Sequence, residues 1–83
     1  MYFVYIIRCS DDTLYTGFTT DIERRINEHN NSNKGAKYTR ARRPVKLEYF
    51  ETFDEKIKAY KREYEIKQLT RKAKLSLITK IYQ

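Results

Sequence analysis

The chain has 83 residues, 40% of them apolar and 14% aromatic, which is enough for one domain with a small core and excludes a long disordered tract. Its eighteen Lys and Arg against eleven Asp and Glu give a formal charge of +7, while one cysteine and one histidine exclude an internal disulfide and a Cys/His zinc site. The apolar opening, residues 2 to 7, is too short for a signal peptide or a membrane span, so we expect a cytoplasmic protein.

The first predicted unit is a β-hairpin over residues 2 to 18. Residues 2 to 8 are aromatic and β-branched, which is typical of a strand buried on both faces. Ser10, Asp11 and Asp12 supply turn residues, and residues 13 to 18 form the returning strand. If the loop has an odd number of residues, Tyr5 and Tyr15 lie on the same face.

A helix is predicted next, over residues 21 to 30. Thr20 and Glu23 have the spacing of a capping box. Arg25 and His29 are four residues apart and therefore share a helix face. The basic stretch from residue 34 to 44 has no helical or strand period and is predicted to be a loop.

The second half predicts one strand and two helices. Alternation over residues 45 to 53 indicates a third strand with Leu47 and Tyr49 inward, and Phe53 left open. A helix over residues 54 to 69 follows, with a second capping box at residues 52 to 55 and an apolar stripe. Thr70 is the expected cap of a last helix. The stripe comprises Ile57, Tyr60 and Tyr64, and the last helix carries Leu75, Ile78 and Tyr82.

The predicted fold is α+β: a small three-stranded antiparallel sheet flanked by about three helices, in the order β-β-α-β-α-α within one domain over residues 1 to 83. The positive charge favours a polyanionic partner, with nucleic acid first. In the loop, basic side chains alternate with one aromatic ring and one hydroxyl, a composition suited to phosphate contacts and to stacking on nucleobases. The candidate nucleic-acid contacts are Gly17, Lys34, Lys37, Tyr38, Arg40, Arg42 and Arg43.

Two tripeptides carry a family resemblance. Phe3-Val4-Tyr5, followed ten residues later by Tyr15-Thr16-Gly17, resembles the paired signature of the GIY-YIG endonucleases. Arg25 and His29 follow at the expected distance, and Glu63 in the run AYKREYEIK stands where that family has its metal-binding glutamate. The resemblance covers nearly the whole chain and is strongest to the small stand-alone members (UPF0213-like), which have no appended DNA-binding domain.

The resemblance implies hydrolysis of phosphodiester bonds in DNA, with a structure-selective role in repair or processing. It implies that Tyr5 or Tyr15 is the base or orients the water, and we favour Tyr5. Arg25 then clamps the phosphate with its planar, permanently charged fork, and His29 orients the water or the base. Glu63 holds one Mg²⁺ or Mn²⁺. We expect no other cofactor, because no dinucleotide or P-loop motif is present.

Several alternatives stay open at this stage. Phe3 and Thr16 replace the glycine and isoleucine of the family signature, and no asparagine occurs beyond residue 33, whereas many active relatives carry one after the glutamate. A non-catalytic nucleic-acid-binding module of the same fold is therefore the second hypothesis, and a protein-interaction domain for an acidic partner is the third. A protein partner could supply specificity, and the sequence leaves the oligomeric state open.

Overall fold

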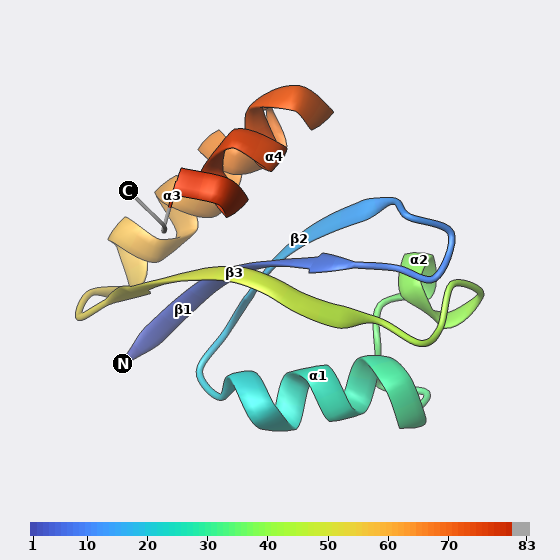
Figure 1. The fold of residues 1–83 in the computed structure, drawn as a ribbon. Helices are drawn as coiled ribbons and strands as arrows, with labels where there is room; N and C mark the ends of the chain where they lie inside the picture. The colour runs from blue at the N-terminus through green and yellow to red at the C-terminus, as the bar shows by residue number, and fades with distance from the viewer. Residues whose placement is uncertain (81–83) are drawn as a thin grey trace.

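The computed structural model describes residues 1–80 and shows a three-stranded antiparallel sheet with helices on both faces (Figure 1). Helices α3 and α4 lie over one face, and α1 lies under the other. The α+β fold is therefore confirmed. In chain order the elements are β1 (Tyr2–Arg8), β2 (Leu14–Thr19), α1 (Ile22–Asn31), α2 (Lys37–Arg40), β3 (Lys46–Phe53), α3 (Lys56–Lys67) and α4 (Arg71–Lys80).

The central strand is β1, and the sheet order is β2-β1-β3. In the β1–β2 hairpin Tyr5 is opposite Gly17 and Ile7 is opposite Tyr15, so odd positions pair with odd positions. Tyr5 and Tyr15 consequently share a face, as the sequence predicted.

Two apolar clusters fill the space above and below β1, because alternate side chains of a strand point to opposite faces. Val4 and Ile6 pack with α3 and α4, whereas Tyr5 and Ile7 pack toward α1. Val4, Ile6 and Ile7 are all completely buried, so β1 is covered on both faces as expected.

Helix α1 begins one residue later than the predicted capping box required. Asp21 is the N-cap, and its carboxylate accepts a hydrogen bond from the Arg24 amide at 3.0 Å. The preceding turn belongs to Thr19, whose hydroxyl accepts from the Asp21 amide at 3.1 Å. The prediction of Thr20 as cap was wrong, because aspartate one position later satisfies the same free amides.

The stretch predicted as a loop contains a short helix, α2. It is four residues long, and no side chain caps it. Thr39, on this helix, is completely buried. A helix this short has no hydrophobic period, which explains why the sequence pattern did not reveal it.

The predicted apolar stripe on α3 is on the wrong face. Ala59 and Ile66 are fully buried against the sheet, while Ile57, Tyr60 and Tyr64 are 73%, 46% and 68% exposed. The helix starts after Glu55 rather than at Asp54, and no side chain caps it, so the second capping box is also wrong. A small residue such as Ala59 lets the helix backbone approach the sheet closely, and hydrophobic size alone does not reveal that.

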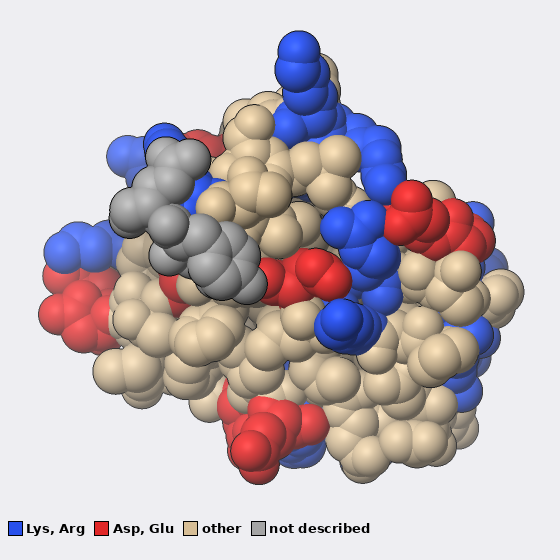
Figure 2. Space-filling model, viewed as in Figure 1, with Lys and Arg blue, Asp and Glu red and all other residues tan. Residues whose placement is uncertain are grey.

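Helix α4 begins as predicted, because the Thr70 hydroxyl accepts a hydrogen bond from the Ala73 amide at 3.1 Å. Ile78 joins the upper apolar cluster, and Leu75 packs against it; Tyr82 lies outside the described residues. On the face shown in Figure 2, Lys and Arg side chains gather over α4 at the top of the molecule. The basic residues of this helix are Arg71, Lys72, Lys74 and Lys80.

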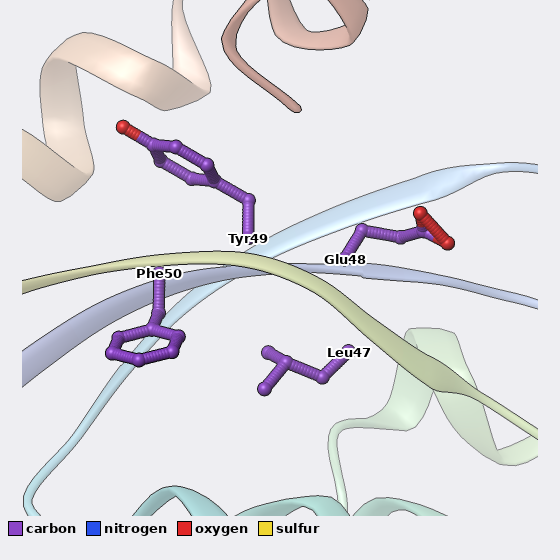
Figure 3. A pocket seen from close by; sticks show the side chains of 4 residues that line it. All are labelled: Leu47, Glu48, Tyr49 and Phe50. Atoms are coloured by element: carbon purple, nitrogen blue, oxygen red, sulfur yellow. The ribbon is translucent and has the colours of Figure 1, made fainter. Parts of the chain in front are cut away.

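Strand β3 does not alternate regularly. A β-bulge shifts the register, so Ile6 is opposite Tyr49 while Ile7 is opposite Leu47. Figure 3 shows the consequence: Glu48 and Tyr49 point to the same side, toward α3 and α4, whereas Leu47 and Phe50 point toward α1. These four residues line a hollow of about 240 Å³. Leu47 and Tyr49 are both inward, but on opposite faces, which simple alternation could not predict.

Candidate active site

Tyr5 lies at the middle of β1 with only 1% of its surface exposed. Its ring lies directly over Gly17 of the neighbouring strand, where a Cβ would be 2.3 Å from the phenol oxygen and 2.5 Å from Cζ. The sequence placed Gly17 among the candidate nucleic-acid contacts. In the structure the space that this glycine leaves is filled by the Tyr5 phenol.

His29 joins Tyr5 to α2 through a chain of buried hydrogen bonds. Its Nε2 is 2.8 Å from the Tyr5 oxygen, and its Nδ1 is 2.9 Å from the Thr39 hydroxyl. The Thr39 hydroxyl donates its own proton to the carbonyl of Ala36 at 2.9 Å. It must therefore accept from Nδ1–H, which leaves Nε2 as the acceptor of the Tyr5 proton. The imidazole is neutral, with its free lone pair facing the phenol.

The pKa values agree with this assignment. Burial, helped by the nearby charges of Arg25 and Arg43, lowers the pKa of His29 from 6.5 to about 4, although Glu28 opposes the shift. Burial raises the pKa of Tyr5 to about 12, although the adjacent Arg25 guanidinium opposes the rise. Both groups are consequently neutral near pH 7, and the Tyr5 proton has one acceptor in place.

Tyr15 is the second aromatic partner of this histidine. The Tyr15 and Tyr5 rings are edge-on to the imidazole, with centroid distances of 5.6 Å and 5.9 Å. Tyr15 also stacks on Tyr38 of α2 at 5.8 Å, and the Arg42 guanidinium covers Tyr38 at 3.9 Å. The two signature tyrosines thus flank one imidazole.

Arg25 extends from α1 beside Tyr5. Its Nη1 donates to the carboxylate of Glu28 and to the main-chain carbonyl of Lys34, both at 2.9 Å. A guanidinium has five N–H donors, so anchoring one nitrogen leaves others for a phosphate. Arg25 also lines an open hollow of about 280 Å³, together with Phe18, Thr19, Thr20, Arg24 and Glu28.

Glu63 is on α3, and its side chain is 19% exposed. Its negative charge makes a minor contribution to the raised pKa of Tyr5, although α3 packs on the sheet face opposite the one toward which the Tyr5 ring packs. It forms an ion pair with Lys67 at 3.1 Å, the i,i+4 pairing expected of a helix glutamate. Among residues 1–80 there is no cluster of three or more His, Cys, Asp or Glu that could hold a metal ion. A lone carboxylate suits Mg²⁺, which keeps several waters and takes further oxygens from phosphate.

The predicted nucleic-acid contacts divide into two groups. Arg43 donates to the carbonyls of Glu28, His29 and Ser32, so it closes the end of α1 and is not a free surface cation. Arg42 is held by the carboxylate of Asp11 at 3.0 Å and by the carbonyl of Tyr38 at 2.7 Å. The exposed members are Lys34, Lys37, Tyr38 and Arg40.

Sequence reasoning missed two members of the site. Thr39, which orients His29, was noted only as a hydroxyl among bases, and Glu28, which holds Arg25, was not singled out. Glu28 could have been found, because it is three residues after Arg25 on the same helix. Thr39 could not, because its role depends on the tertiary placement of α2.

The model of the GIY-YIG catalytic domain matches residues 1–76 of this chain. The chain belongs to the GIY-YIG family. A UPF0213 protein of Desulfotalea psychrophila is 60% identical over 77 residues, which cover 93% of this chain and 70% of that protein. A UPF0213 protein of Staphylococcus saprophyticus is 56% identical over 78 residues, covering 94% of both chains.

A solved structure agrees with this membership. The solution NMR structure of a UPF0213 protein from Bacillus halodurans is 48% identical, with a TM-score of 0.61 over 95% of this chain and 84% of that one. Membership in the GIY-YIG family implies nuclease-like chemistry and nucleic-acid binding. Within residues 1–80, no helix combines the length and the apolar character needed to cross a bilayer.

Proposed function

We propose that this chain is a metal-dependent endonuclease that hydrolyses phosphodiester bonds, with DNA as the favoured substrate and a structure-selective role in repair or processing. The observation that carries the proposal is the buried hydrogen bond from Tyr5 to a neutral His29, 2.8 Å long, beside Arg25. Besides joining β1 to α2, this histidine gives the Tyr5 phenol a proton acceptor.

In this mechanism Tyr5 takes a proton from the attacking water as it passes its own proton to Nε2 of His29. A phenol with a pKa of about 12 is not a phenolate at neutral pH, so it acts as a base only if its proton leaves at the same time. The phosphate charge, drawn toward the site, would favour the imidazolium that forms. Within residues 1–80 the Tyr15 hydroxyl has no such acceptor, which supports Tyr5 as the base.

Arg25 supports the phosphate in this proposal. Its anchors, Glu28 and the Lys34 carbonyl, hold the guanidinium at the edge of the hollow before substrate binds. Glu63 would hold a divalent ion, which when bound supplies charge to neutralise the leaving oxygen. Lys67 would have to release the Glu63 carboxylate for that purpose.

The test uses purified protein with nicked, branched and single-stranded DNA in Mg²⁺ or Mn²⁺. Tyr5→Phe, Arg25→Ala and Glu63→Gln should each lose about 10²-fold or more of the cleavage rate. Glu65→Gln is the matched control, because Glu65 is on the same helix with a side chain 53% exposed and is paired with Arg62. Cleavage that persists unchanged in Tyr5→Phe and Glu63→Gln would end the site assignment.

A non-catalytic binding module of the same fold is the second candidate, and two observations favour it. The Glu63 carboxylate is already neutralised by Lys67, and the chain has no asparagine after residue 33. This candidate predicts salt-dependent binding of nucleic acid without metal and no scission under any of the conditions above.

A further inference from the structure

The exposed apolar face of α3 is the starting observation. Ile57 and Tyr64 are 73% and 68% exposed, and Tyr60 is 46% exposed, although a helix packed on a sheet normally buries its large apolar residues. At about 100° per residue, these three side chains fall within about 60° of one another around the helix axis. We call Ile57, Tyr60 and Tyr64 the α3 strip.

The strip begins at the candidate active site. Glu63 lies on the same helix between Tyr60 and Tyr64, turned further toward the sheet by the same helical geometry. At the inner end the Tyr60 ring contacts Phe18 of β2, with centroids 4.5 Å apart. Phe18 in turn lines the hollow beside Arg25. Phe18 therefore connects the α3 strip to the hollow that Arg25 lines.

Most of the charged side chains beside the strip are positive, and Glu63 is paired with Lys67. The Lys56 ammonium is 5.5 Å from the centre of the Tyr60 ring, and Lys61 and Lys67 are exposed beside the strip. Of the other acidic residues near this helix, Glu55 and Glu65 pair with Lys58 and Arg62 on the opposite flank. Glu51 also pairs with Arg62, and Asp54 is exposed just before the helix. Lysine is depleted from the cores of protein–protein interfaces, so lysines among exposed tyrosines fit a polyanion better than a protein partner.

We propose that the α3 strip stacks the unpaired bases of a single-stranded segment next to the phosphate that Arg25 holds. Tyr60 and Tyr64 are about 6 Å apart along the helix axis, so each can take the face of a separate base. The faces of paired bases are hidden inside a duplex, and this surface therefore selects nucleic acid with a single-stranded flank. The inference rests on the proposed function for its substrate class and adds a specificity element to it.

The experiment measures binding without catalysis, in EDTA and at one fixed salt concentration. The probes are a fluorescent single-stranded oligonucleotide, a duplex of the same length, and a strand of the same length with abasic sites, which keeps the phosphates but removes the bases. Tyr64→Ala should weaken binding of the normal strand about 5- to 10-fold, whereas Tyr64→Phe should keep the parent affinity. Both variants should bind the abasic strand like the parent.

Phe50→Ala is the control, since Phe50 is an aromatic 49% exposed on β3, away from α3. It should leave all three affinities unchanged, with circular dichroism confirming that each variant is folded. If Tyr64→Ala weakens binding of the normal and abasic strands equally, or weakens neither, base stacking is overturned. If that variant instead loses self-association of the protein, the strip binds a second copy of the chain. A parent that binds through Tyr64 but never cleaves would leave this inference standing while refuting the nuclease.

Discussion

Replacing Thr39 by valine tests the proton relay at the residue farthest from the substrate. Valine has nearly the same shape but cannot accept the hydrogen bond from His29 Nδ1, which is 2.9 Å long and buried. The carbonyl of Ala36 keeps its bonds from the amides of Thr39 and Arg40. The substitution therefore leaves one buried group without a partner, the Nδ1–H of His29.

The size of the effect follows from that single loss. A buried N–H without a partner costs about 1–3 kcal/mol. For a domain of this size each kcal/mol lowers the melting temperature by about 4–8 °C. The imidazole can relieve the cost by moving its proton to Nε2, where it no longer accepts from Tyr5, so the cleavage rate should fall by about 10²-fold.

The assay combines cleavage rates with ¹⁵N-resolved NMR of the imidazole, which is simple because the chain has one histidine. Parent protein should show the proton on Nδ1, and Thr39→Val should show it shifted or exchanging. Thr39→Ser restores the hydroxyl and should restore both the tautomer and the rate. If Thr39→Val keeps the Nδ1 proton and the parent rate, the reasoning about the relay is refuted.

Three further predictions concern stability. Burial lowers the pKa of His29 from 6.5 to about 4, so between these values the unfolded chain binds a proton that the folded chain does not. The free energy of unfolding should therefore fall by about 2 kcal/mol as the pH drops from 7 to 4.5. An imidazole that titrates near pH 6.5 in the folded protein by NMR would contradict this. Thr16 is 2% exposed, and its hydroxyl has no hydrogen-bond partner within residues 1–80. Thr16→Val should therefore raise the free energy of unfolding by about 1 kcal/mol and the melting temperature in a thermal scan by several degrees. An unchanged or lower melting temperature would argue against an unpaired hydroxyl. Gly17→Ala forces the Tyr5 ring from its place, so it should lower the free energy of unfolding in urea by about 1–3 kcal/mol and also slow cleavage. If the variant matches the parent in both measurements, the ring is not confined by this glycine.

The sequence was most informative where local periodicity and fold geometry agree. The hairpin register that brings Tyr5 and Tyr15 to one face follows from the pairing of odd positions, and the shared face of Arg25 and His29 follows from helix geometry. The strand and helix order followed from the same patterns, apart from α2. These features required only neighbours in the chain or across one turn.

The remaining features depend on packing between distant segments. The bulge in β3 moves Tyr49 to the face opposite Leu47, and no alternation rule places such an insertion. On α3, size favoured Tyr60 and Tyr64 as the buried stripe, but close packing of the helix on the sheet required Ala59. Tertiary packing therefore overrode the pattern wherever close approach mattered more than hydrophobic area.

The basic segment shows why composition alone misassigned side chains. Arg43 closes the end of α1, and Thr39 in the same segment orients His29, so part of this stretch builds the site instead of contacting substrate. Gly35 fits the same role, because a Cβ there would be 2.8 Å from the backbone of Glu28 and His29. Removing the Arg43 guanidinium would therefore disturb the imidazole before it altered any phosphate contact. Removing the exposed Lys37 would instead weaken binding and reduce its salt dependence.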